Sequence, residues 1–395
     1  MQNFLLESTI QAIIDKYPET AAVLTSFNLL PADAATRNIL RLKTGLQLKK
    51  LNSEVFVKLL LDAIADAGQY RRLANVMTAK PDTFTFAAQL PCALNLPLSY
   101  AFKSALEQFQ QRRPYPCSHY IWSCSNDVLA YADYLQQLTD IDKAPDLLFT
   151  TDYNLFNENF IERFVKKGYY TSCQSWPVPG FLHNTGIADT EGWYNVIAVN
   201  PVVVVLDCRQ LGKLPVPAAW RDLLRPEYEQ MLVLNGSSGD FDDIVLLNIY
   251  KEYGAAGIAA LRRSVRTGLH PSQMIKSMAG NNPDRPPLYV MPYFFANTIA
   301  PPAETKIIWP EDGTFITPLS FLVKKDKQAE MQELLDFLTG PELGRICADA
   351  YFPSLHPQVE CHLPANIRLK WLGWDYIRRQ DTGELLARLN RSFLG

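Results

Sequence analysis

Hydrophobic and polar positions follow two different patterns before and after residue 79. In the first part apolar residues recur at helical intervals, as Ile10, Ile13 and Ile14 do, and later apolar stretches repeat this spacing. One face of each such helix would be buried against its neighbours. We therefore expect residues 1–75 to form a small all-α domain that has its own core.

After residue 79, apolar runs of strand length alternate with longer helical stretches. The expected strands are 83–90, 119–123 and 146–151. The expected helices are 100–110, 127–138 and 155–166. This alternation predicts parallel strands joined by helical crossovers. Ligands bind such sheets at the C-terminal ends of the strands, so the loops 91–97, 124–127 and 151–154 become candidate ligand loops.

A second α/β block follows. Strand material is expected at 193–208, interrupted by Pro201, and at 231–234, 288–295 and 314–323. Helices are expected at 218–224, 242–253, 328–338 and 341–351. The last forty or so residues carry Trp371, Trp374 and Phe393, and we expect this extension to pack back on the body.

Composition limits the class of protein. The chain has 395 residues, which predicts two or three domains because single cores rarely exceed about 250–300 residues. Hydrophobic residues make up 48% and charged residues 20%, as in ordinary globular proteins. The net charge of -3 and the absence of a Lys/Arg stripe argue against nucleic-acid binding. No stretch approaches the ~20 apolar residues of a membrane span, so no membrane insertion is expected.

Cysteine usage and the N-terminal sequence bear on location. Seven cysteines are scattered without a CxxC pair: Cys92, Cys117, Cys124, Cys173, Cys208, Cys347 and Cys361. An odd number at irregular spacing argues against a disulfide framework. The N-terminus lacks the features of a secretory signal. Together these features predict a cytoplasmic protein.

Five segments carry a resemblance to a known family. They are PAAWRDLLRPEYEQMLVL, Gly254–Ile258, LYVMPYFFAN, IIWPEDGTFITPLSFLVKK and FLTGPELGRI. These residues resemble type 2 periplasmic binding proteins, the solute-binding proteins of ABC transporters, and especially their ferric-iron-binding branch. The resemblance covers roughly residues 80–360. Separately, residues 5–65 resemble a small helical domain of unknown function, although the stretch 29–35 lacks the cysteine pair that this domain often carries.

The resemblance implies two α/β lobes with a ligand in the cleft between them and closure by a hinge motion. Lobe I would comprise 80–200 plus 315–350 and lobe II 201–314, with 351–395 as the extension. The iron binders of this branch use neighbouring tyrosines as ligands. Here Tyr293 is followed by two phenylalanines, so a phenolate pair is absent at the matching segment.

Candidate ligand residues lie at the loops that would face the cleft. In lobe I they are Cys92, Asn95, Ser123, Ser125 and Asn126. In the glycine-rich loop before the helix at 242 they are Ser237, Ser238 and Asp240. Later candidates are Tyr293, Asp312 and Thr314. Each has a structural alternative: a buried cysteine, a capped loop, an aromatic core or a tight Asp-Gly turn.

No reactive constellation is evident. The five histidines form no H-E-x-x-H motif or i,i+4 pair, and His270 before Pro271 suits a helix cap. We assign no catalytic residue, metal or cofactor and predict a non-enzymatic protein. It would bind a small polar molecule or ion, for sensing or delivery, and the N-terminal domain could contact a protein partner. The rival hypotheses are a transferase that tethers its substrate through Cys92 or Cys124, and an interaction protein without a ligand.

Overall fold

A computed structural model describes most of the chain. The described residues are 2–18, 20–26, 29–31, 33–49, 53–54, 56–57, 60–61, 63–64, 84–112, 117–123, 128–151, 153–173, 177–237, 240–280, 282–299 and 304–394. The chain divides into two compact units. Unit 1 comprises residues 1–78, 203–242 and 255–310, and unit 2 comprises 79–202, 243–254 and 311–395. The domain boundaries expected from the sequence stay predictions.

The N-terminal part of unit 1 is helical, as its apolar spacing predicts. Its helices are α1 (Gln2–Glu7), α2 (Ile10–Lys16), α3 (Thr20–Ser26), α4 (Ala34–Ile39) and α5 (Leu42–Leu48). Helix α2 contacts α3 and α4, and α1 contacts α5. The fully buried side chains of Ile10, Ile13 and Leu46 form part of the core between them. Thr9 caps α2 by accepting a hydrogen bond from the backbone N–H of Ala12.

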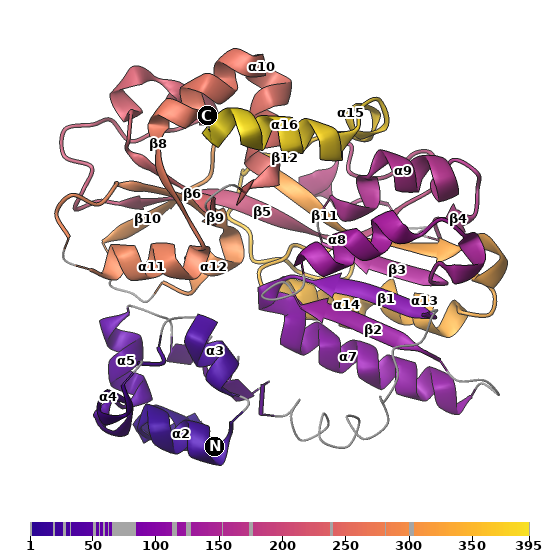
Figure 1. The fold of residues 1–395 in the computed structure, drawn as a ribbon, viewed down its shortest axis with the longest axis horizontal. Coiled ribbons are helices and arrows are strands. Elements are labelled where there is room, and N and C mark those ends of the chain that lie inside the picture. The colour runs from indigo at the N-terminus through magenta and orange to yellow at the C-terminus, as the bar shows by residue number, and fades with distance from the viewer. Residues whose placement is uncertain are drawn as a thin grey trace. The chain divides into compact units, whose positions relative to one another are not determined.

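Unit 2 is built on a mixed sheet with the strand order β2-β1-β3-β11-β5 (Figure 1). Its strands are β1 (Phe86–Leu90), β2 (His119–Ser123), β3 (Leu147–Thr150), β11 (Thr314–Lys324) and the first part of β5 (Asn195–Asp207). The first three are parallel to one another, whereas β11 runs antiparallel to both β3 and β5. Short β4 (Tyr170–Thr171) and β12 (Leu369–Trp371) also pair with β11.

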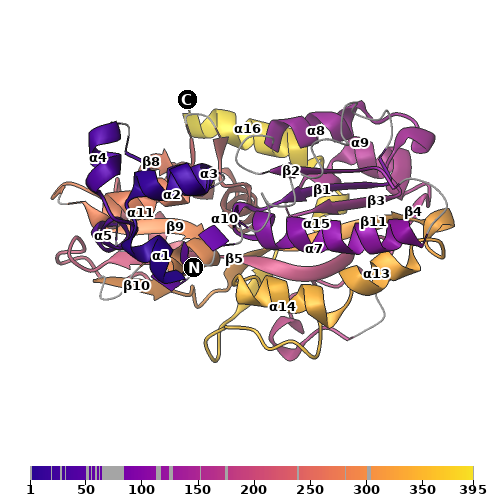
Figure 2. The ribbon, with the colours of Figure 1, turned by 90° about the horizontal axis from the view of Figure 1, so that it is seen from below.

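Helices cover both faces of this sheet, which explains why its strands are apolar on both faces. Helices α7 (Cys92–Gln111), α13 (Gln332–Leu338) and α14 (Pro341–Asp349) contact one another on one face, where Figure 2 shows them side by side. On the other face lie α8 (Val128–Gln137) and α9 (Glu158–Phe160), which continues into a π-helical turn (Ile161–Val165) (Figure 1). Phe102 of α7 packs edge-on against Phe86 of β1 and Phe149 of β3.

The C-terminal residues pack on unit 2 through their tryptophans. Trp371 stacks on Tyr153 and Trp374 stacks on Tyr194, with Phe156 between them. Two helices follow, α15 (Trp374–Arg378) and α16 (Thr382–Leu394). The apolar side of α16 buries Leu385, Leu389 and Phe393, so the extension is part of the folded core.

The sheet of unit 1 contains the second part of β5, β6 (Leu232–Ser237), β8 (Val265–Leu269), β9 (Leu288–Pro292) and β10 (Thr305–Ile308). Strand β6 lies parallel to β8 and β9, and β10 pairs antiparallel with β5. Short β7 (Asp240–Phe241) folds back on the end of β6. The helices are α11 (Pro271–Ala279), α12 (Tyr293–Asn297) and the second part of α10 (Asp243–Ser264).

Helix α10 is long and apolar enough to cross a membrane by length and composition, contrary to the expectation that no stretch qualifies. Half of this apolar stretch is buried inside the protein. Gly254 also interrupts the helix with φ 62° and ψ −158°, a conformation that is essentially restricted to glycine. The residues before and after this break belong to different units. These features are those of a core helix.

Several predicted boundaries differ from the structure. Helix α7 begins at Cys92, eight residues before the predicted start at 100, and keeps Pro97 inside. Strand β5 continues through Pro201, which pairs with Ile316 of β11 instead of ending the strand. The predicted strand 288–295 ends at Pro292, and α12 follows at once. At Pro97 and Pro201 pairing or packing partners outweigh the local preference of proline, whereas at Pro292 the strand ends as that preference favours.

Candidate functional site

The ends of three parallel strands define one edge of unit 2. Strand β1 ends at Leu90, β2 at Ser123 and β3 at Thr150, and the register aligns Leu90 with Ser123. Because the strands are parallel, their carboxyl ends share the edge at which α/β sheets bind ligands. The hydroxyl residues Thr150 and Thr151 lie at this edge and are buried. The edge therefore matches the region predicted from the loops.

A row of polar side chains crosses the sheet just inside this edge. Ser320 of β11 pairs with Thr150 of β3. Gln89 follows Ala88, whose partner in β3 is Phe149, so Gln89 lies level with Thr150. All three side chains of the row are fully buried. Polar groups at successive strands are unusual in a sheet covered on both faces, where apolar residues predominate.

Ser320 stands out in this row because its hydroxyl has no hydrogen-bond partner among the described residues. The hydroxyls of Thr314 and Thr317 on the same strand share this property, and both side chains are buried. A buried polar group without a partner costs about 1–3 kcal/mol. Buried hydroxyls of this kind are candidates for contact with a ligand or for a structural role in β11.

The backbone of the ligand residues predicted in lobe I, where it is described, lies at the expected edge of the sheet. Cys92 and Asn95 lie in the first turns of α7, directly after β1, rather than in an open loop. Ser123 is the last residue of β2. The side chains of these three residues, and the whole of Ser125 and Asn126, lie outside the described part of the chain. Their role as ligand contacts stays a prediction.

The predicted glycine-rich loop of unit 1 is partly a strand pair. Ser237 of β6 pairs with Asp240 of β7, while Ser238 lies outside the described residues. Asn235 closes this turn, because its amide donates to Asp242 at 3.1 Å and its carbonyl accepts from the Asp242 backbone at 2.9 Å. These two hydrogen bonds give Asp242 a structural role in closing the turn.

The later candidates are more enclosed than expected. Tyr293 begins α12, is 7% exposed and packs edge-on against Trp309 at 4.6 Å between ring centroids. This packing is that of the aromatic core given as its alternative. Asp312 is half-buried at a turn whose glycine, Gly313, has φ 111°, and Thr314 is fully buried at the start of β11. The backbone at 312–313 therefore forms the tight Asp-Gly turn that was the structural alternative for Asp312.

His270 has the structural role expected of it. It is the N-cap of α11, where its Nδ1 accepts from the backbone N–H of Ser272 and the side chain of Gln273 accepts from the His270 backbone. Both ends of this capping box are thereby satisfied.

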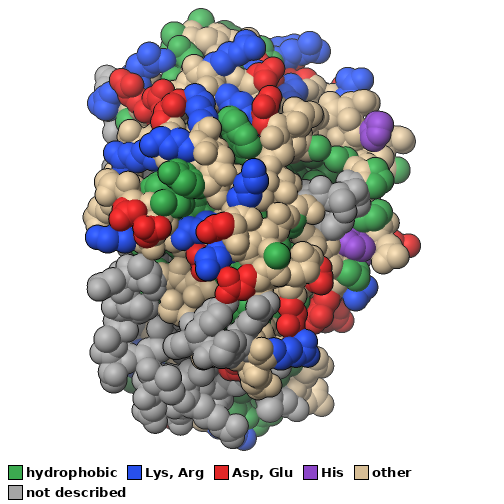
Figure 3. Space-filling model, turned by 90° about the vertical axis from the view of Figure 1, so that its right-hand side faces the viewer, with side chains coloured by type: hydrophobic (Ala, Val, Ile, Leu, Met, Phe, Trp, Pro, Cys, Tyr) green, Lys and Arg blue, Asp and Glu red, His purple; other side chains and the backbone are tan. Residues whose placement is uncertain are grey.

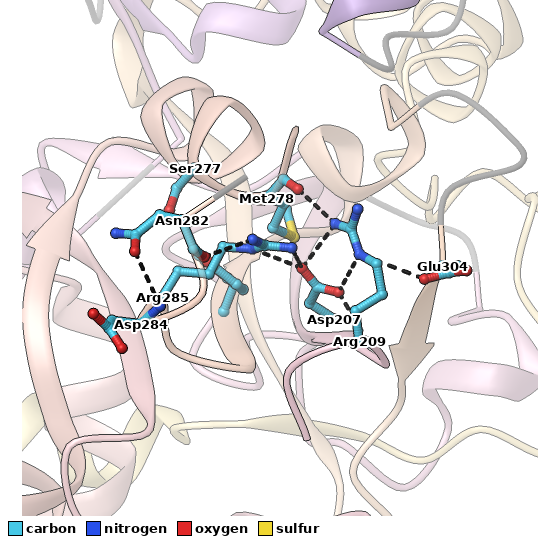
Figure 4. A network of polar contacts seen from close by, with 9 residues as sticks. Asp207, Arg209, Ser277, Met278, Asn282, Asp284, Arg285 and Glu304 are labelled. Atoms are coloured by element: carbon cyan, nitrogen blue, oxygen red, sulfur yellow. Dashed lines mark hydrogen bonds and ion pairs between the residues drawn. The ribbon is translucent and has the colours of Figure 1, made fainter. Parts of the chain in front are cut away.

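Unit 1 contains a buried charge cluster that was not predicted from the sequence (Figure 4). The fully buried carboxylate of Asp207, at the end of β5, accepts hydrogen bonds from the guanidinium groups of Arg209 and Arg285. Arg209 also donates to the carbonyl of Met278, and Arg285 to that of Asn282. These donors are engaged within the protein, so the cluster joins β5 to the loop after α11. No local motif signals it, because Arg285 is 78 residues away from Asp207 in sequence.

Neither the surface charges on the face described below nor the metal-ligating side chains of the described residues point to a further site. On the face shown in Figure 3, Lys and Arg side chains are interspersed with Asp and Glu, without a large patch of one sign. Among the residues that the structure describes, no group of three or more His, Cys, Asp or Glu side chains could hold a metal ion. The prediction of a ligand between the two lobes stays a prediction.

Comparison with solved structures defines the fold. The chain is similar to a ferric binding protein from Campylobacter jejuni, with TM-score 0.54 and 14% identity over 78% of this chain and 98% of that one. It is also similar to Trichodesmium IdiA (FutA) in complex with iron and citrate, with TM-score 0.54 and 12% identity over 78% and 99%. A third match is the periplasmic binding protein AfuA from Actinobacillus pleuropneumoniae with fructose-6-phosphate bound, with TM-score 0.50 and 11% identity over 79% and 97%. These likenesses confirm the predicted two-lobed type 2 periplasmic-binding-protein fold.

A family model described as "Bacterial extracellular solute-binding protein" matches residues 142–380. No curated protein matches the chain. The expectation of a cytoplasmic protein is therefore wrong, since this is a family of extracellular proteins. That expectation rested on the beginning of the sequence and on cysteine spacing, and neither feature determines where a protein works.

The prediction of a non-enzymatic protein is confirmed, because the family and the similar structures are binding proteins. The cysteine-tethering transferase finds no support among them. The matched range spans more than half of the chain and includes most of the sheet of each unit. The chain belongs to the bacterial extracellular solute-binding protein family.

Proposed function

We propose that the protein binds a small polar solute against the strand-end edge of unit 2. The observation that carries this proposal is the register that places Gln89, Thr150 and Ser320 level on three neighbouring strands. Amide and hydroxyl groups can donate to and accept from a polar ligand without a fixed charge. Ser123 ends β2 at the same edge, the predicted contacts Ser125 and Asn126 come next in the sequence, and the three would add further hydroxyl and amide groups.

A panel of candidate compounds can identify the chemical class of the ligand. Among similar structures, one holds iron and citrate and another fructose-6-phosphate. We propose that the solute of this chain is likewise small and rich in oxygen, because hydroxyls and amides suit oxygen-bearing groups. The N-terminal helices would serve as a docking module for a protein partner in sensing or delivery.

A thermal-shift screen of the full chain tests the proposal. The panel contains ferric citrate, citrate, phosphate, sugar phosphates and amino acids. A ligand that binds only the native state at 100 times its Kd stabilises it by about 2.7 kcal/mol, which is a clear rise in melting temperature. If no compound raises the melting temperature, the interaction protein without a ligand becomes the better description.

Matched variants connect a positive result to the edge. Ser320→Ala should weaken ligand binding by roughly tenfold while leaving the fold intact, because its hydroxyl has no hydrogen-bond partner to lose among the residues that the structure describes. Ser264→Ala is the control, since Ser264 is equally buried but donates to the Leu223 carbonyl in unit 1. It should lower stability and leave ligand affinity unchanged. Equal effects of the two variants on affinity would contradict the proposed site.

A further inference from the structure

The end of α14 and the segment that follows it form a closed loop in unit 2, from Cys347 to Cys361. Cys347 lies in the last turn of α14, and its carbonyl accepts from the backbone N–H of Phe352 at 2.9 Å, where the chain turns back. At the other end of the loop, the sulfur of Cys361 accepts from the backbone N–H of Ser354 at 3.2 Å. Both thiols are free, and neither belongs to the proposed solute site.

Two further contacts bring the returning chain back to the helix. Gly344 lies in α14, one turn before the first cysteine, and a Cβ placed there would stand 3.0 Å from Cγ2 of Val359. The ring of His362 packs on that of Tyr351 at 5.9 Å between centroids. Helix α14 and the turn that ends it therefore contact residues on both sides of the second cysteine, so the two cysteines belong to one compact cluster.

The same loop pairs with the first part of β5. The backbone N–H of Val199 donates to the carbonyl of Pro353 at 2.9 Å, and that of Leu355 donates to the carbonyl of Ile197 at 2.8 Å. These two hydrogen bonds join the loop to the strand as a short additional strand would. An uncovered strand edge is a site of aggregation, so a covalent bond that fastens this loop would protect the sheet of unit 2.

We propose that Cys347 and Cys361 form an intramolecular disulfide that closes this loop. The family to which the chain belongs is extracellular, and disulfides form and persist in oxidising surroundings outside the cytoplasm. Closing the loop restricts the freedom of the unfolded chain, which is how such a bond stabilises the folded one. The inference goes beyond the proposed function, because it concerns neither the solute nor the strand-end edge.

The bond forms by thiol–disulfide exchange with a small disulfide oxidant such as oxidised glutathione. Cys361 is half-buried and Cys347 is fully buried, so the Cys361 thiol loses its proton to water and attacks first. This step makes a mixed disulfide and releases one glutathione thiolate. Cys347 then loses its proton and attacks the Cys361 sulfur, which expels the second glutathione. Two protein thiols are oxidised, and the oxidant takes both electrons and leaves as two thiols.

One tryptic peptide reports the bond. Trypsin cuts after Arg345 and Arg368, and the peptide between these cuts contains both cysteines and no other. The full-length protein is incubated with oxidised glutathione, its remaining thiols are blocked with N-ethylmaleimide, and the digest is analysed by mass spectrometry. We expect this peptide without a label and lighter by two hydrogen atoms than its reduced form. A further cut after Glu360, which lies between the two cysteines, should leave the halves joined until a reductant is added.

Serine variants test the order of the two steps. Cys347→Ser should stop at a mixed disulfide between Cys361 and glutathione, whereas Cys361→Ser should leave Cys347 unmodified because its side chain is buried. Cys208→Ser, at an exposed cysteine of unit 1, is the matched control and should form the bond as the wild type does. Burial raises the pKa of both thiols of the pair, so the exchange should be faster at about pH 9 than at about pH 7.

The native fold should favour the bond. Its equilibrium constant against glutathione should be at least about tenfold higher in the native protein than in urea, because the fold holds the cluster together. Three outcomes would overturn the inference: no unlabelled peptide after oxidation of the native protein, a bond no more favoured than in urea, or a bond from Cys361 to a cysteine other than Cys347. The wild type itself carries the test if a variant fails to fold. No readout involves a solute, so this inference and the strand-edge proposal fail independently.

Discussion

Arg285 donates from both Nε and Nη2 to the same carboxylate oxygen of Asp207, at 3.0 and 2.8 Å, in the interior of unit 1. The other oxygen of Asp207 accepts from Nε of Arg209 at 2.9 Å. The Asp207 side chain is fully buried, and that of Arg285 is 4% exposed. The carboxylate therefore holds two cationic groups in place, one from its own segment and one from a distant segment.

Loss of this carboxylate should destabilise the protein strongly. Asp207→Asn removes the charge that balances two guanidinium groups, and breaking a buried ion pair by removing one partner costs about 3–5 kcal/mol. Urea denaturation followed by circular dichroism measures the effect. Asp284→Asn, at an exposed carboxylate in the neighbouring loop, should stay within about 0.5 kcal/mol of wild type. A loss below 1 kcal/mol in Asp207→Asn would show that the cluster contributes little.

The same group predicts a dependence on acid pH. Burial by itself would raise the pKa of Asp207, but the hydrogen bonds from Arg209 and Arg285 outweigh it and hold the pKa below its ordinary value. A carboxyl whose folded-state pKa is lowered contributes stability above its unfolded-state pKa of about 3.9 and loses it as pH falls through the folded-state pKa. The stability difference between wild type and Asp207→Asn should thus be constant from pH 5 to 7 and shrink below about pH 4. A difference that grows on acidification would contradict this assignment.

Gly254 should resist substitution. Its φ of 62° and ψ of −158° lie in a region essentially reserved for glycine, so Gly254→Ala should cost about 1–3 kcal/mol although the added Cβ would meet no more distant part of the described chain within 4 Å. Gly180 offers the control, since it also has open space but no positive φ. Gly180→Ala should change the free energy of unfolding by less than about 0.5 kcal/mol. Similar effects of the two substitutions would contradict the backbone explanation.

The C-terminal extension should depend on Arg378. Its guanidinium pairs with the fully buried carboxylate of Asp189 and lies 4.8 Å from the ring centre of Trp193. Asp189 keeps hydrogen bonds from the backbone N–H groups of residues 191, 193 and 194 when the arginine is removed. Arg378→Ala should therefore cost about 2 kcal/mol, whereas Arg379→Ala, at an exposed neighbour, should be close to neutral. Thermal denaturation of both variants checks the contrast.

The described cysteines should differ in reactivity. Cys208 is exposed, whereas burial raises the pKa values of Cys117 and Cys173 to about 11 each. At pH 8 a thiol with this pKa is about one-thousandth thiolate, and the thiolate is the reactive form. Mass spectrometry after brief maleimide treatment of the native protein should find Cys208 labelled before Cys117 and Cys173. Prior labelling of Cys117 would contradict the buried position that the structure gives it.

Local patterns predicted elements well where the sequence preference and the packing agree. The strand at His119–Ser123 has the predicted bounds, because it is a short apolar run beside a proline-containing turn sequence. Prediction failed at Pro201 and Cys92, where a partner strand and a longer helix outweigh the local signal. The sequence predicted that the candidate site lies at one edge of the sheet, because parallel strands place their carboxyl ends together. The members of the row at Gln89, Thr150 and Ser320 were missed, since their alignment depends on the register of three strands.

By itself the sequence determined the helical start, the α/β alternation and the family resemblance, because these depend on spacing along the chain and on local motifs. Only the tertiary structure decided that Asp207 would bind two arginines, that Ser320 would be buried with no hydrogen-bond partner in the described part of the chain and that α16 would line a pocket with Asp243. Apart from the contact between Asp207 and its near neighbour Arg209, these relationships join residues far apart in sequence, and their distances are set by strand register and helix packing. Periodicity reports which face of an element is buried, whereas the identity of the neighbour on that face is a property of the folded chain.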